Sequence, residues 1–237
     1  MAIKDIFLPL VGEPNAAAIA AIDKCMAVSS GFGAHVTAVA AEESLFIRPK
    51  VMISSDLKNT EQPEALRSVT DARGLLRAFD AAANRCTVRN EQRLGRLTSP
   101  DVPGHFVESA RLADLSMVPV KPDDGQSEKI AERLIFKSGR PVLLCPEESA
   151  GDLPVGFNRV VMGWDHSAPA ARAVADALPL LQGARDVRIV TATDETTEAE
   201  LESGASLVRH LAEHGIAASF APVAIDGSSV GNCSKPT

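Results

Sequence analysis

One sequence motif in this chain matches the pattern of a zinc-dependent hydrolase site. His210, Glu213 and His214 fit H-x-x-E-H, which can place two imidazoles on one helix face around Zn²⁺ with the carboxylate as general base. A third, distant ligand would be needed, and few residues follow His214. Gly215 indicates that His214 ends a helix, where the helix dipole favours histidine. We therefore interpret the pattern as a chance match and expect no metal site.

Asp165 and Ser167 form the polar pair whose position best fits a binding site. They follow the apolar run 160–164 and precede a segment with helical periodicity. Open parallel sheets bind ligands at the carboxyl ends of their strands, where this pair would lie. Both side chains can equally cap the following helix, because a serine N-cap contributes about 1 kcal/mol without any ligand. We favour capping, and binding stays open.

Other motifs associated with cofactors or nucleophiles lack their required context. Gly31-Phe-Gly33 has the start of a dinucleotide fingerprint, but it follows a predicted helix and precedes a strand, the reverse of the necessary order. Gly227-Ser-Ser-Val-Gly231 lacks the lysine of a phosphate-binding loop. The same five residues also spell Gly-x-Ser-x-Gly, but we interpret them as part of a tail and find no convincing base for a Ser or Cys nucleophile. Cys145 falls in a predicted buried strand, where thiols are usually inert. We expect neither an enzyme nor a bound cofactor.

The composition is that of an ordinary globular protein. Of the 237 residues, 45% are hydrophobic and 23% charged, and the formal net charge is -7. Nucleic-acid binding is disfavoured, because only 4% of residues are aromatic and the charge is negative. The apolar stretch 16–22 is far too short to span a bilayer, and the N-terminus lacks a signal-peptide pattern. Four widely spaced cysteines predict neither a disulfide nor a zinc framework. We expect a cytoplasmic protein without membrane or nucleic-acid partners.

An internal repeat determines the expected fold. Residues 5–20 and 159–174 share an apolar strand, a turn and a helix, and both copies continue into a second strand, at 33–40 and 186–193. A repeated β-α-β unit of this kind implies right-handed crossovers and a parallel sheet with helices on both faces. The sequence therefore predicts an α/β protein with a tandem repeat.

The hydrophobic patterns give the order of the elements. In the first copy we expect strands at 6–11, 35–41, 87–94, 115–119 and 141–145, a helix from the Asn15 cap to a stop at Gly31, an irregular stretch at 44–62, and helices at 63–84, 102–112 and 127–137. In the second copy we expect strands at 160–164, 187–192 and 217–224 and helices at 168–181 and 198–214.

The repeat predicts two domains, 1–148 and 157–237, joined by a linker rich in turn-forming residues. The second copy has no counterparts of the last two strands and two helices of the first. Residues 225–237 lack apolar periodicity, which is typical of a tail. We therefore expect one complete five-stranded domain followed by an incomplete copy.

Three motifs, in order and spacing, resemble the universal stress protein (UspA-like) family, specifically its tandem members. They are the strand-Asp-x-Ser-helix segment at 160–167, the Ala-Asp-Leu entry to a strand at 110–118, and the closing-strand segment at 138–146. This resemblance implies the adenine nucleotide α-hydrolase-like fold. It also implies a non-enzymatic regulatory or stress-response protein.

The resemblance further implies where a nucleotide would bind. In nucleotide-binding members of the family, an Asp at the end of the first strand contacts the nucleoside. Asp165 matches that position, with Ser167 beside it, whereas the counterpart in the first copy is Val11, which cannot accept a hydrogen bond from a ribose. Weak binding of ATP or AMP at Asp165 is therefore the alternative function.

The phosphate loop of the family is only partly matched. Its members have a Gly-x-x-Gly segment after the fourth strand, whose backbone N–H groups hold phosphates. This chain has a single glycine there, Gly125, preceded by Asp123 and Asp124, whose charges repel a triphosphate. We therefore expect no tight ATP binding.

The last strand of the first copy suggests a partner. The resemblance implies that this edge strand mediates pairing, and the second copy offers no equivalent strand to meet it. An exposed apolar strand edge favours association, because pairing with another strand covers the edge. We expect a homodimer through the edge around 142–144, with other protein partners unknown.

Overall fold

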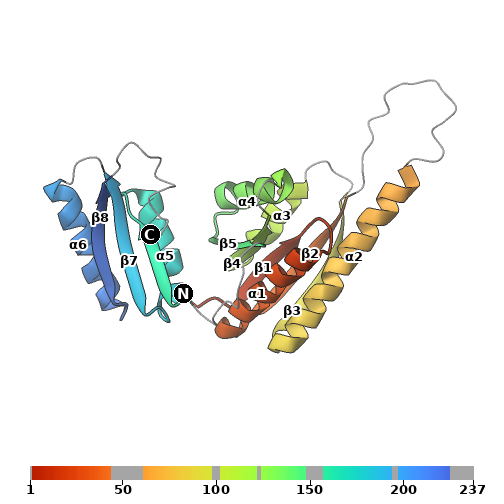
Figure 1. Cartoon of the computed structure of the whole chain (residues 1–237), viewed down its shortest axis with the longest axis horizontal. Helices are drawn as coiled ribbons and strands as arrows, with labels where there is room; N and C mark the ends of the chain where they lie inside the picture. The colour runs from red at the N-terminus through yellow and green to blue at the C-terminus, as the bar shows by residue number, and fades with distance from the viewer. Residues whose placement is uncertain are drawn as a thin grey trace, which may run out of the picture. The chain divides into compact units, whose positions relative to one another are not determined.

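The chain folds into two α/β units, which are described separately (Figure 1). The first comprises Ala2–Leu153 and the second Pro154–Thr237. The computed structural model describes residues 2–43, 61–97, 102–121, 124–147, 157–193 and 197–224. No helix in these ranges combines the length and the hydropathy needed to cross a bilayer.

The first unit alternates strands and helices throughout. Its elements are β1 (Asp5–Leu10), α1 (Ala16–Phe32), β2 (His35–Glu43), α2 (Glu61–Cys86), β3 (Arg89–Leu97), α3 (Val102–Ala110), β4 (Leu115–Val120), α4 (Gly125–Lys137) and β5 (Val142–Pro146). All strands are parallel and lie in the order β3-β2-β1-β4-β5. The chain progresses from β1 to β3 in one direction and then returns to β4, so the order reverses between β1 and β4.

That reversal distributes the helices over both faces of the sheet. Right-handed crossovers put α1 and α2 on one face and α3 and α4 on the other, as Figure 1 shows. The central strands β1 and β4 are apolar because both faces are covered, whereas the edge strand β3 is largely polar. Phe7 of β1 and Phe106 of α3, with ring centroids 5.9 Å apart, lie in the core between the sheet and the second helix pair.

Helix α1 begins where the sequence predicts, and its end lies two residues beyond the predicted one. The Asn15 side chain accepts a hydrogen bond from the Ala18 N–H at 2.9 Å. The predicted stop at Gly31 is wrong, because Gly31 is helical and Gly33 takes the left-handed conformation with φ 59°. Gly33 and the buried Ala34 donate their N–H groups to the last carbonyls of the helix, which satisfies its C-terminus.

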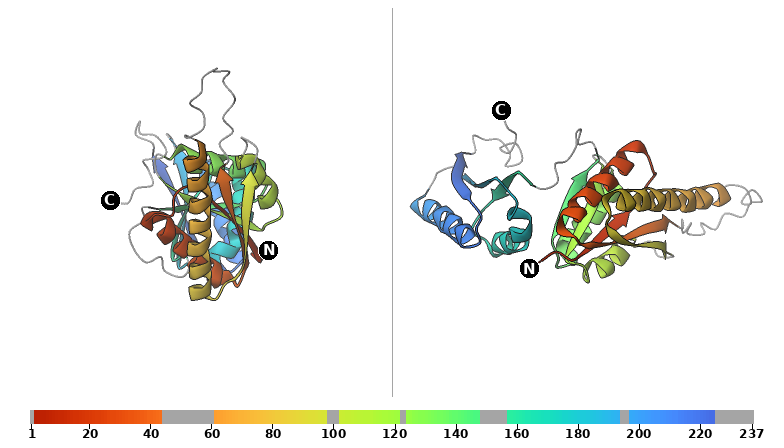
Figure 2. Two further views of the ribbon diagram at one scale, coloured as in Figure 1. Left: turned by 90° about the vertical axis from the view of Figure 1, so that its right-hand side faces the viewer. Right: turned by 90° about the horizontal axis from the view of Figure 1, so that it is seen from below.

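The described residues of the second unit form three parallel strands and two helices. Its elements are β6 (Arg159–Gly163), α5 (Ala168–Leu181), β7 (Asp186–Thr193), α6 (Glu198–Glu213) and β8 (Ala218–Ala224), with strand order β6-β7-β8. Both helices lie on one side of this sheet (Figure 2), where Val187, Ile189 and Leu211 are buried. Val161 of β6, between the partly buried Val160 and Met162, is 61% exposed.

The predicted fold class is confirmed, with a five-stranded and a smaller three-stranded parallel sheet. The types of the expected elements agree, and the differences lie at their ends. Helix α2 begins at Glu61, inside the stretch expected to be irregular, and β3 extends to Leu97. The rest of that stretch, 44–60, and the expected tail, 225–237, lie outside the described residues.

Candidate functional site

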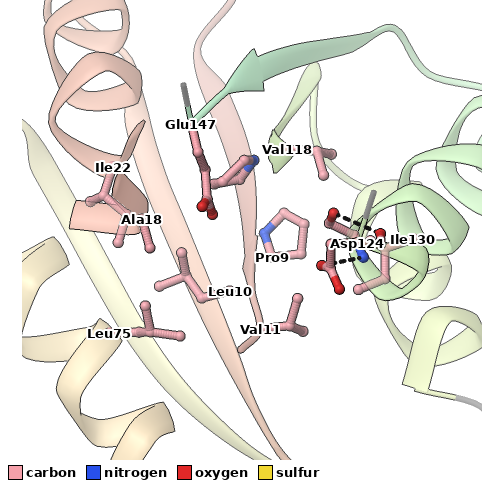
Figure 3. A pocket seen from close by; sticks show the side chains of 12 residues that line it. Pro9, Leu10, Val11, Ala18, Ile22, Leu75, Val118, Asp124, Ile130 and Glu147 are labelled. Carbon is pink, nitrogen blue, oxygen red and sulfur yellow. Dashed lines mark hydrogen bonds between the residues drawn. The ribbon is translucent and has the colours of Figure 1, made fainter. Parts of the chain in front are cut away.

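The carboxyl ends of β1 and β4 form the place where an open sheet of this topology binds ligands, because the strand order reverses there. A pocket does lie at this point, and its volume is only about 20 Å³. That is room for about one water molecule. Figure 3 shows the side chains that line it. Leu10, Ile22 and Leu75 come from β1, α1 and α2, whereas Val11 follows β1, Asp124 precedes α4 and Glu147 follows β5.

Val11 follows β1 at the position that matches Asp165 of the second copy. It is partly buried and packs against the core beneath α3 and α4. Leu10, next to it, is only 2% exposed. These side chains close the floor of the pocket by apolar packing and provide no hydrogen-bond acceptor for a ribose.

The start of α4 is occupied by its own side chains. The carboxylate of Asp124 accepts a hydrogen bond from the Ser127 N–H at 3.1 Å, as an N-cap does. The hydroxyl of Ser127 donates to the Asp124 carbonyl at 3.2 Å and accepts from the Lys121 N–H at 3.3 Å. Two N–H groups at this loop and helix end are therefore already bonded. Asp123 lies outside the described residues.

Negative charge lines the same pocket. Asp124 lies on one side, and Glu147, which follows β5, extends over the other (Figure 3). A phosphate placed between these groups would meet two carboxylates at close range, where like charges repel. The pocket thus opposes a nucleotide by its volume and by its charge.

The second unit brings Asp165 and Ser167 together just after β6. Asp165 accepts a hydrogen bond from the Ser167 N–H at 2.9 Å, and the Ser167 hydroxyl accepts one from the Ala170 N–H at 3.2 Å. The Ser167 side chain and N–H lower the pKa of the Asp165 carboxyl by hydrogen bonding. The capping geometry is therefore formed, and nucleotide binding by this pair stays a prediction.

A groove that sequence reasoning missed lies beside this turn. It measures about 540 Å³ and is lined by Trp164 and His166 with residues of α5 and α6, among them Val174, Glu202, Ser203 and His210. The Trp164 indole N–H donates to the Ser203 hydroxyl at 2.9 Å. His166 has a left-handed backbone with φ 60°, and its ring centroid is 5.8 Å from that of Trp164. Asp165 is not among the lining residues.

The equivalent position in the first unit is closed. The counterpart of Trp164 is Leu10, which is buried. There, α1 and α2 pack together, and a Cβ at Gly74 of α2 would be 2.7 Å from the Pro14 side chain. The sequence holds one signal for the groove, because the single Trp of the chain directly precedes Asp165. The space between α5 and α6 depends on tertiary packing, which the sequence pattern does not show.

The H-x-x-E-H segment forms no metal site in the part of the chain that is described. His210 and His214 lie one turn apart on α6, with ring centroids 4.9 Å apart. Among the described residues, no group of three His, Cys, Asp or Glu side chains gathers as metal ligands would. Zinc needs a third protein ligand, and the described residues place none beside these two histidines.

Neither a protein-family model nor a curated protein matches this chain. Solved structures do. A universal stress protein from Archaeoglobus fulgidus DSM 4304 superposes with a TM-score of 0.63 at 13% identity, covering 92% of this chain and 77% of that chain. A putative universal stress protein from Pseudomonas aeruginosa UCBPP-PA14 gives 0.49 at 13% identity, covering 93% and 74%. A protein of the universal stress protein family from Burkholderia pseudomallei gives 0.44 at 19% identity, covering 60% and 96%.

The first of these likenesses extends over both units of the chain. At such identities a structural match shows the fold, and the match agrees with the motifs at 110–118, 138–146 and 160–167. The resemblance noted in the sequence is thereby confirmed at the level of structure: the chain has the universal stress protein fold.

Proposed function

We propose that this protein is a non-enzymatic, cytoplasmic regulatory protein of the universal stress type, which acts through contacts with other proteins and binds no ATP tightly. The observation that carries the proposal is the filled pocket at the ends of β1 and β4, with its volume of about 20 Å³. A nucleotide would need far more room, since pockets for ligands of that size measure about 300–1,000 Å³.

Opening that pocket would be costly. Leu10 and Ile22 are buried core residues, and their displacement would expose apolar surface at roughly 25 cal/mol per Å². The N–H groups at the start of α4 would have to exchange the Asp124 carboxylate and the Ser127 hydroxyl for phosphate oxygens. Phosphate binding would therefore have to replace hydrogen bonds that the Lys121 and Ser127 N–H groups already make.

The absence of a recognisable catalytic set in the described residues supports a non-enzymatic role. A hydrolase needs a nucleophile beside a base or a metal-bound water. Among the described residues, no three metal-ligating side chains gather, and the small pocket presents carboxylates beside apolar groups. These observations support a regulatory role through protein contacts and speak against catalysis in the pocket.

The alternative is a weak ATP or AMP sensor that uses Asp165. One observation favours it: the groove beside Trp164 and His166 has a volume of about 540 Å³, within the range of ligand pockets. Trp164 could stack on a base there, with Asp165 on the adjoining turn reaching the ribose. No phosphate-binding loop accompanies this groove in the described residues, so the expected affinity is low.

Calorimetric titration distinguishes the regulatory function from the nucleotide sensor. ATP and AMP, with and without Mg²⁺, are titrated into the wild type, Asp165→Ala and the control Asp186→Ala, which removes an exposed carboxylate at the opposite end of the strands. The proposal predicts no heat of binding and no thermal shift at millimolar nucleotide. Binding at or below millimolar nucleotide that Asp165→Ala abolishes and Asp186→Ala preserves would replace the proposal with the sensor.

A further inference from the structure

Two cysteines far apart in the sequence meet in the first unit. Cys25 belongs to α1 and is fully buried, and Cys145 belongs to β5 and is 7% exposed. The helix and the strand that carry them are in contact, and each thiol shifts the pKa of the other. Both thiols are free, so the pair is a reduced dithiol in the structure.

The position of α1 over the sheet accounts for one half of this contact. Ser29 is one helical turn beyond Cys25, and its hydroxyl lies 3.5 Å from the sulfur of Met117 in β4. A crossover helix runs antiparallel to the strands, so Cys25 lies about 6 Å along the helix axis from Ser29, toward the carboxyl ends of the strands.

The pairing of β4 with β5 accounts for the other half. Met117 is level with Leu143, and the two therefore face α1 together. Cys145 lies two residues further on, about 6.6 Å along the strand and on the same face, because side chains alternate. Leu144 between them points to the opposite face and is 44% exposed. Helix and strand thus bring Cys25 and Cys145 to the same level.

The surroundings give the two thiols different reactivity. The hydrogen bond from Cys25 lowers the pKa of the Cys145 thiol, and the charge of Lys24 acts in the same direction. The hydrogen bond to Cys145 and burial raise the pKa of the Cys25 thiol. Thiolate is the reactive form, so Cys145 is suited to attack and Cys25 to act second.

We propose that Cys25 and Cys145 form a peroxide-oxidisable dithiol, which closes into a disulfide between α1 and the edge strand β5. Cys145 lies on the outermost strand of the sheet, between the exposed residues Leu144 and Pro146. A molecule as small as hydrogen peroxide needs only slight opening of this edge to reach its sulfur.

The reaction balances with peroxide as the sole oxidant. The Cys145 thiolate attacks one peroxide oxygen, the O–O bond breaks, and the leaving hydroxide takes a proton to become water. The sulfur of Cys25 then attacks the sulfenic sulfur of Cys145, the S–O bond breaks, and a second water leaves with the Cys25 proton. Two electrons pass from the two sulfurs to peroxide, and small thiols reverse the change.

The test uses a full-length background variant, Cys86→Ser with Cys233→Ser, which keeps only the proposed pair. Its fold is first checked against the wild type by circular dichroism and thermal melting. Peroxide is then added to the folded protein, and thiols, intact mass and non-reducing peptide maps are measured. Cys25→Ser and Cys145→Ser in the same background serve as single-thiol controls.

We expect loss of both thiols, a mass decrease of two hydrogen atoms, a Cys25–Cys145 cross-linked peptide, and recovery with dithiothreitol. Cys25→Ser should stop at a sulfenic acid that dimedone traps, and Cys145→Ser should keep its thiol. The proposal is overturned if the folded background variant keeps both thiols at a peroxide concentration that oxidises Cys86 in the wild type, or if its cross-links join different chains. Should either single variant not fold, the thiol count and mass of the background variant decide alone.

Discussion

At the scale of single residues, the polar groups most suggestive of a site are used for local structure. Asp165 and Ser167 bond the turn and the first N–H groups of α5, and Asp124 does the same for α4. Helix starts attract anions because their N–H groups are unpaired, so a carboxylate that caps them competes with any phosphate. The same residue types serve either purpose, and the occupied N–H groups decide between them.

Ser167 provides the first test of this interpretation. Ser167→Ala removes the acceptor for the Ala170 N–H and is expected to lower the stability of the second unit by about 1 kcal/mol. The measurement is urea unfolding followed by fluorescence of Trp164, the single Trp of the chain, which reports on this unit. Ser206→Ala is the matched control, because this hydroxyl accepts from the Arg209 side chain and from no helix N–H in the described contacts. Equal midpoints for both variants would contradict the capping role.

At the scale of elements, one helix approaches its strand through a glycine. Gly204 of α6 is buried, and a Cβ built on it would lie 2.5 Å from ring atoms of Phe220 in β8. Such a distance requires the ring or the helix to move. The glycine therefore sets how closely α6 packs on β8.

Gly204→Ala is expected to destabilise the second unit by about 1–2 kcal/mol. Overpacking costs about 1–3 kcal/mol, and the better helix propensity of alanine returns up to about 1 kcal/mol of it. Trp164 fluorescence in urea again measures the change. Gly183→Ala, which meets nothing within 4 Å, should leave the midpoint unchanged. A Gly204→Ala protein as stable as the wild type would show that Phe220 rotates away freely.

The same scale shows what could be predicted from the sequence. Local signals suffice for the elements: the Asn15 and Ser167 caps and the apolar runs of the strands lie where the structure has them. The prediction of Gly31 was wrong because two glycines lie near the helix end, and the structure uses Gly33 as the left-handed cap. Features that join distant elements, such as the groove beside Trp164, depend on packing that no short pattern encodes.

The cysteines show the same limit most clearly. Their wide spacing predicts no framework, and Cys145 alone looks like an inert core thiol. Only the register of β5 beside β4 and the placement of α1 bring Cys25 within reach of it. In the candidate site, likewise, the missing acceptor at Val11 was visible in the sequence, whereas the filled volume between β1 and β4 was not.

At the scale of the whole molecule, β5 ends the larger sheet and presents an edge. Among the described residues of the first unit, no strand pairs with its outer side, and Leu144 of this strand is 44% exposed. Such an edge can pair with a second copy of itself, which would extend the sheet and cover its apolar groups. We therefore keep the homodimer through 142–144 as a proposal.

Leu144→Lys tests this association. Two copies paired through β5 would bring two added charges close together, and like charges across a strand pair destabilise it. Sedimentation at tens of micromolar is expected to show a dimer for the wild type and a monomer for Leu144→Lys. Leu201→Lys, an equally exposed leucine at 44% on α6, should stay dimeric. A wild type that sediments as a folded monomer, or a Leu201→Lys variant that dissociates equally, would remove β5 as the interface.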